Sequence, residues 1–139
     1  MDTSILSNIN WLAVLVAGAA YFMLGALWYS VLFGKAWIKL SGVNVNDPNA
    51  KKGAGAIMFA SFILMLVASI GLALLISKIG TYTWMTGAKT GLVAGVCFSV
   101  TGISISYLYE KRPMGLHLIN GAYNTIGCII AGIIISVWP

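Results

Sequence analysis

Four long apolar segments alternate with shorter polar ones along the chain. The segments are 9–33, 54–77, 85–109 and 114–137, and the only charged residue inside them is Lys89, near the start of the third. Each has about 25 residues, enough at about 1.5 Å per residue for a helix to cross a hydrocarbon core of about 30 Å. The pattern predicts an all-α, polytopic membrane protein, a bundle of four transmembrane helices that forms one domain over residues 1–139.

Residues 34–53 form the longest connection between the apolar segments. We expect its first part, GKAWIKL, to continue as an interfacial turn or helix that holds Trp37 in the headgroup layer. The helix that follows, 54–77, has only three serines as polar side chains. We therefore expect it to face lipid more than the other helices do.

The fourth apolar segment has two different sides. At about 100° per residue, its small and polar residues share one side: His117, Asn120, Gly121, Asn124, Thr125, Cys128, Ala131 and Gly132. The other side is apolar: Leu118, Ile119, Ala122, Ile126, Ile129, Ile130 and Ile133. Because hydrocarbon satisfies no polar group, the polar side should face away from lipid.

The third segment supplies a natural partner for that polar side. Small residues gather on one of its faces: Gly87, Ala88, Gly91, Gly95, Ser99, Gly102 and Ser106. Small residues at four-residue spacing let helix backbones approach closely in a membrane. We predict helix packing through Gly87, Gly91, Gly95, Gly102 and Ser106, with Gly121 and Gly132 on the fourth helix.

Composition supports a membrane location. Hydrophobic residues make up 60% of the chain and charged residues 8%, with a mean hydropathy of +0.94. Soluble domains carry about 25% charged residues, so lipid must surround most of this chain.

The positive charges mark one side of the membrane. Six of the eight cations lie in the first and third connections, and we expect them to contact lipid headgroups: Lys35, Lys39, Lys51, Lys52, Lys111 and Arg112. The positive-inside rule then places both connections in the cytoplasm and both termini outside it. No basic stripe interleaved with aromatic residues is present, so we expect no nucleic-acid partner.

The small number of reactive side chains excludes most kinds of catalytic and metal-binding site. The chain has one histidine, three carboxylates and two separated cysteines, Cys97 and Cys128, which we interpret as packing residues. We therefore predict no catalytic residue, no cofactor and no metal site, and hence no enzyme. Small multidrug antiport by a four-helix protein also needs an acidic residue within the span, which this chain lacks.

The polar side of the fourth helix allows two interpretations. His117, Asn120, Asn124, Thr125 and Cys128 could line a pathway for a small solute or ion. Alternatively, they could hydrogen-bond across helices, worth about 0.6 to 2 kcal/mol each. We favour the hydrogen bonds.

Several motifs carry a family resemblance. NWLAVLVA, YFMLGALWYS, LFGKAW, EKRP and LINGAYN occur in this order, and the chain thereby resembles a small bacterial membrane family, domain of unknown function 1761. The resemblance implies a four-span protein without assigned activity. Members often carry Tyr-His where this chain has Tyr123 and Asn124, which argues against a metal or proton role for this position.

Together these patterns predict a non-enzymatic, multi-pass protein of the bacterial inner membrane that forms homo-oligomers among membrane lipids. The alternative is an oligomeric transporter or channel for a small solute or ion, lined by the polar side of the fourth helix.

Overall fold

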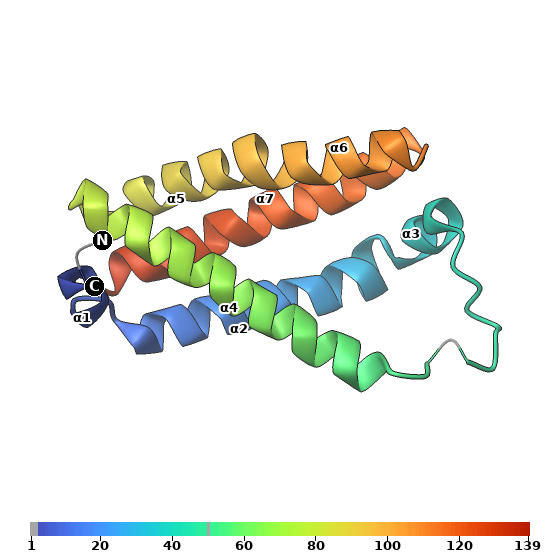
Figure 1. Cartoon of the computed structure of the whole chain (residues 1–139), viewed down its shortest axis with the longest axis horizontal. Coiled ribbons are helices and arrows are strands. Elements are labelled where there is room, and N and C mark those ends of the chain that lie inside the picture. The colour runs from blue at the N-terminus through green and yellow to red at the C-terminus, as the bar shows by residue number, and fades with distance from the viewer. Residues whose placement is uncertain (1–2, 50) are drawn as a thin grey trace.

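Four helices dominate the computed structural model, which describes residues 3–49 and 51–139 (Figure 1). They span Trp11–Leu32, Ala54–Ile79, Trp84–Tyr109 and Met114–Val137, and each is long and apolar enough to cross a membrane. Every boundary lies within two residues of the range expected from the apolar pattern. The described ranges contain no strand. The prediction of an all-α, four-span membrane protein is therefore confirmed.

Two of the four spans contain a π-helical turn. The first span consists of α2 (Trp11–Leu27) and the π turn η1 (Trp28–Leu32), and the third of α5 (Trp84–Val93), the π turn η2 (Ala94–Val100) and α6 (Thr101–Tyr109). The other two spans are continuous helices, α4 (Ala54–Ile79) and α7 (Met114–Val137). Short helices α1 (Ser4–Ser7) and α3 (Gly34–Ser41) flank the first span, α3 at the expected interfacial segment.

Local sequence explains where the spans begin and end. The side chain of Asn10 accepts hydrogen bonds from the backbone N–H groups of Leu12 and Ala13 at the start of α2 (3.1 and 3.2 Å). Thr83 caps α5 in the same way, through the N–H of Thr86 (3.2 Å). Gly80, with φ of 74°, follows α4 in a left-handed conformation that glycine adopts without strain.

Helix α7 lies at the centre of the bundle. It contacts α2, α4, α5, η2 and α6, and 50% of its span is buried, against 11% of the third span. Figure 1 shows α7 in red running alongside α5 and α6, with α2 and α4 on its other side. The second span is 22% buried. Our expectation that this span would be the most lipid-exposed is thus wrong, because the third span packs mainly against α7 and buries only Gly87, Gly91 and Gly95 of its described residues.

The first span covers part of the apolar side of α7. Ile119 is buried, and its carbonyl accepts a hydrogen bond from Nε1 of Trp28 (3.2 Å). The two-sided sequence pattern of α7 therefore predicts only part of its burial. A helix enclosed from two directions buries apolar residues as well as polar ones, and periodicity alone does not show how many neighbours a helix has.

Helix α4 begins outside the bundle and packs into it only in its second half. Its second half packs inward through Ser69, Leu72, Ala73 and Ile76, whereas residues 54–60 are exposed. Figure 1 shows the first half of α4, in green, diverging from the other three spans. The divergence leaves clefts between this half of α4 and the helices opposite.

Candidate functional site

A tight seam joins α5 to the C-terminal half of α7. A β-carbon on Gly95 would lie 2.6 Å from Cα of Thr125. β-Carbons on Gly91 and Gly87 would collide with the backbone carbonyls of Cys128 and Gly132. Glycine is required at all three positions, since backbone atoms cannot move aside as a flexible side chain can. This glycine seam is a structural contact that leaves no room for a solute.

Beyond Gly95 the predicted helix-packing face no longer contacts α7. Gly102 and Ser106 are exposed, and nothing lies within 4 Å of a β-carbon built on Gly102. The prediction that they pack against the fourth helix is wrong. The cause is the π turn η2, whose additional residue per turn rotates the remainder of the span by roughly 100° relative to a regular helix.

After the rotation, different residues of α6 face α7. Nδ1 of His117 and Oγ of Ser104 lie 3.1 Å apart in a hydrogen bond, and Nδ2 of Asn120 donates to the hydroxyl of Tyr107 (2.6 Å). Gly121 meets Val100, because a β-carbon on it would lie 3.3 Å from Cγ2 of that valine. The polar half of α7 thus packs against hydroxyl groups of α6 and not against glycine.

Tyrosines of the first span complete a hydrogen-bond network with the two asparagines of α7. The hydroxyl of Tyr29 donates to Oδ1 of Asn120, and the hydroxyl of Tyr21 donates to Oδ1 of Asn124 (2.5 Å). Nδ2 of Asn124 donates to the carbonyl of Asn120 one turn earlier (2.8 Å). The hydroxyl of Tyr123 donates to the carbonyl of Tyr21 (3.1 Å). We call Tyr21, Tyr29, Tyr107, Asn120, Tyr123 and Asn124 the tyrosine–asparagine network.

This network uses the polar groups of α7 inside one subunit. Asn120 is only 9% exposed and His117 8%. Within residues 3–49 and 51–139, every buried side-chain nitrogen and oxygen has a hydrogen-bond partner. Thr125 donates to the carbonyl of Gly121 in its own helix (2.9 Å). The geometry therefore matches interhelical hydrogen bonding along most of the polar side.

The tyrosines were missing from the predicted site. Tyr21 and Tyr29 lie eight residues apart and well inside the first apolar segment, and Tyr107 lies near the end of the third. A phenolic hydroxyl in hydrocarbon needs a partner, so buried tyrosines and asparagines in different spans could have been paired. Which hydroxyl meets which amide depends on helix rotation, and no sequence period supplies that.

Four members of the network, Tyr21, Tyr29, Tyr123 and Asn124, also border open space. A cleft of about 270 Å³ lies between α4, η2 and α7 and is lined by Tyr21, Ser61, Ser99 and Asn124 among others. An adjoining cleft of about 310 Å³ separates α2 from α4, with Tyr29, Ser61 and Tyr123 in its lining. The contact between the Tyr123 hydroxyl and Sδ of Met65 (3.8 Å) lies where they meet. These clefts offer hydroxyl and amide groups to a small molecule that enters beside α4.

Six of the eight basic residues gather at one end of the bundle. Nη1 of Arg112 donates to the carbonyl of Ser41 (3.2 Å), which ties the α6–α7 turn to the end of α3. Arg112 also lies 4.0 Å from the carboxylate of Glu110. The remaining cations of this end, Lys35, Lys39, Lys51, Lys52 and Lys111, are exposed. Their contact with lipid headgroups stays a prediction.

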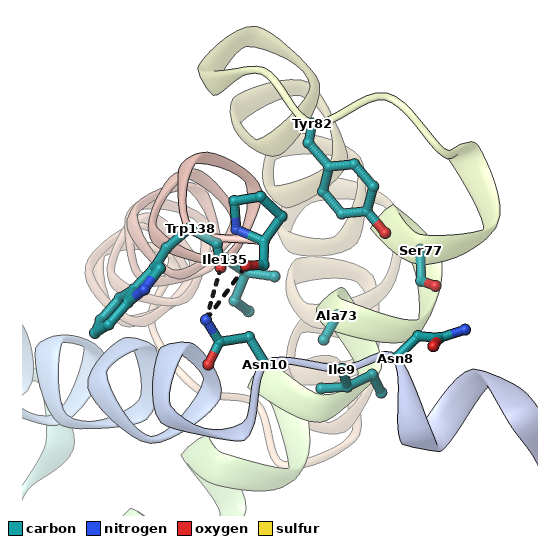
Figure 2. A pocket seen from close by; sticks show the side chains of 9 residues that line it. Asn8, Ile9, Asn10, Ala73, Ser77, Tyr82, Ile135 and Trp138 are labelled. Carbon is teal, nitrogen blue, oxygen red and sulfur yellow. Dashed lines mark hydrogen bonds between the residues drawn. The ribbon is translucent and has the colours of Figure 1, made fainter.

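At the opposite end of the bundle, the start of the first span contacts the segment that follows the last span. Figure 2 shows the side chain of Asn10 directed at the backbone of Trp138, to whose carbonyl its Nδ2 donates (3.2 Å). The pocket around this contact, which Ile9, Ala73 and Ile135 help to line, has a volume of only about 30 Å³. Such a space holds about two water molecules. It is a junction between the first and last spans and not a ligand site.

Groups that could hold a metal ion do not come together in the described ranges, where no three His, Cys, Asp or Glu residues form a cluster. Cys97 is exposed and Cys128 buried in the glycine seam. The histidine, His117, has Ser104 as its hydrogen-bond partner and packs edge-on against the ring of Tyr107.

One family model matches nearly the whole chain. It is described as "Protein of unknown function (DUF1761)" and covers residues 12–136. The chain belongs to this family. Neither a curated protein nor a solved structure matches significantly. Membership in DUF1761 confirms the resemblance seen in the motifs. The matched range contains the tyrosine–asparagine network and the glycine seam. The family description assigns no activity to either.

Proposed function

We propose that this chain is a non-enzymatic membrane protein that associates with copies of itself through the outer face of α6. The observation that carries the proposal is the exposure of Gly102 and Ser106, two small residues four positions apart. No described neighbour lies within 4 Å of a β-carbon built on Gly102. In a bilayer, such a pair allows close approach of a second helix.

The surroundings of Gly102 and Ser106 support this contact. Phe98 is 71% exposed one turn before Gly102, and Ile105, Leu108 and Tyr109 line a shallow groove of about 360 Å³ on the same helix. Large side chains beside a small-residue depression give a partner helix both a hole and a ridge to pack against. The absence of enzymatic activity is supported by the network, whose polar groups bond to one another instead of converging on a shared substrate position.

Gly102→Leu tests the proposed interface. We expect the variant to fold like the parent protein, because no atom lies near that position, but to shift from oligomer to monomer in native mass spectrometry from mild detergent. Ala122→Leu, at an exposed position of α7, is the matched control and should leave the oligomer intact. An unchanged stoichiometry in Gly102→Leu would contradict the proposal, as would a monomeric parent protein in detergent and in lipid nanodiscs.

A second candidate function is binding of a small solute in the clefts beside α4, which keeps open the alternative of an oligomeric transporter or channel. The observation that favours it is the position of Asn124, which is half-buried, belongs to the network and lines the cleft of about 270 Å³. Solute flux into proteoliposomes that falls in Asn124→Leu, but not in Ala122→Leu, would support it. Flux absent across a broad panel of small polar solutes and ions would contradict it.

The orientation in the membrane follows from the charges. We infer an inner-membrane protein of bacteria with α3, the 42–53 connection and the α6–α7 turn in the cytoplasm, because the basic residues of all three lie at the same end. An alkaline phosphatase fused after Pro139 should then be active outside the cytoplasm. An active fusion within the 42–53 connection, with an inactive one after Pro139, would reverse the orientation.

A further inference from the structure

A groove between two spans lies at the end of the bundle opposite to the basic loops. It has a volume of about 520 Å³ and runs between the C-terminal end of α4 and the third span. Its wall is mainly apolar, formed by Leu75, Ile79, Val93, Ala94 and Phe98. Lys78 and Lys89 also line it, one from each helix.

Neither lysine forms an ion pair with a carboxylate of the described residues. In the described parts of the chain, the one ion pair is that of Arg112 with Glu110, in the α6–α7 turn. Lys78 and Lys89 are both exposed. Lys89 lies inside a candidate membrane span, five residues after its first residue, Trp84. Tryptophan favours the membrane interface, and five residues advance the helix by about 7.5 Å from it. An unpaired cation at this depth attracts an anion from the headgroup layer.

The dimensions of the groove match one leaflet of a bilayer. From Lys89 to Phe98 the helix advances by at most about 14 Å at 1.5 Å per residue, because the π turn η2 has an additional residue per turn. Half of a hydrocarbon core of about 30 Å is about 15 Å. A ligand that fills the groove therefore has a negative group near the lysines and an apolar chain that extends toward the middle of the membrane.

We propose that this groove is a binding site for an anionic phospholipid. Its phosphate lies between the ammonium groups of Lys78 and Lys89, and one acyl chain follows the apolar wall to Phe98. A zwitterionic lipid carries the same chains, but its own cation opposes the two lysines. The groove shares Phe98 with the surroundings of the proposed interface on α6, but Gly102 and Ser106 are not among its lining residues.

Native mass spectrometry of the purified full chain tests the site. Protein incubated with equal amounts of phosphatidylglycerol and phosphatidylcholine should retain phosphatidylglycerol preferentially. Each of Lys78→Gln and Lys89→Gln should weaken that retention about fivefold, and the double variant about thirtyfold. Lys51→Gln with Lys52→Gln removes the same charge from an exposed loop at the other end. The headgroup contacts predicted for these two lysines are those of an exposed surface, so their loss should change retention far less. Equal losses in the two double variants would show general charge attraction and overturn the proposal.

A groove-filling variant tests the acyl chain separately. Val93 is 53% exposed and lines the groove, so Val93→Trp fills it without a change of charge. We expect retention of phosphatidylglycerol to fall while the thermal unfolding temperature without added lipid stays within a few degrees of the parent value. Retention equal to that of the parent would overturn the proposal. Loss of oligomers in Val93→Trp, with retention unaltered in both lysine variants, would assign the groove to a second copy instead and also overturn it.

Discussion

The two halves of the third span have the same kind of sequence and opposite surroundings. In α5, Gly87 and Gly91 lie so close to α7 that a β-carbon would strike its backbone. In α6, Gly102 has open space around it and Ser106 is exposed. Small residues at four-residue spacing therefore indicate that a close contact is sterically allowed, and not that a helix uses it within the subunit.

The π turn η2 separates these halves and determines their different roles. Before it, the face toward α7 consists of glycines, and after it that face carries Ser104 and Tyr107. The same rotation turns Gly102 outward. The π turn thus provides hydroxyl partners for His117 and Asn120, and it also releases a small-residue pair to the lipid side of the protein.

The largest effect should come from substituting a glycine of the seam. Gly95→Leu forces a side chain into the backbone of Thr125, and overpacking of this kind costs about 3 kcal/mol or more. Gly102→Leu is the matched variant in the other half and should change the free energy of unfolding by less than about 0.5 kcal/mol. Unfolding in mixed micelles of dodecyl maltoside and SDS measures both. Equal destabilisation of the two variants would remove the distinction between the halves.

A smaller loss is expected in the tyrosine–asparagine network. Asn120→Leu leaves the hydroxyls of Tyr29 and Tyr107 without their amide partner and should destabilise the protein by about 2 kcal/mol. For Asn124→Leu we expect about 1 kcal/mol, because Asn124 bonds to one tyrosine hydroxyl, that of Tyr21, whereas Asn120 bonds to two. The same unfolding assay distinguishes them. A greater loss for Asn124→Leu would place the structural centre of the network at the cleft.

The smallest predicted effect compares two serines of α6. Ser104→Ala removes the hydrogen bond to His117 and should cost about 0.6 kcal/mol. Ser106→Ala alters an exposed position and should leave the free energy of unfolding unchanged within error. If instead Ser106→Ala is the destabilising substitution, the span is a regular helix without the π turn, and the face predicted from the sequence is restored.

Much of the architecture was predictable because it depends on length and hydropathy. A segment such as 114–137 must form a helix of about that length, since a bilayer leaves no other way to satisfy its backbone. The predicted pairing of Gly87, Gly91 and Gly95 with the fourth helix also agrees with the structure, because glycine leaves an unusually narrow ridge. The prediction failed at Gly102 and Ser106, where a regular period was assumed across residues 94–100.

The sequence by itself therefore determined that this is a four-span membrane protein of a family of unknown function, with a glycine face and a polar side that must avoid lipid. Only the tertiary structure decided that α7 is central, that tyrosines of the first span bond to Asn120 and Asn124, and that α6 presents its small residues outward. The physical reason is rotation about the helix axis. Burial and hydrogen bonding depend on where each helix points its side chains, and that angle is determined by the neighbouring helices and by π turns that hydropathy does not record.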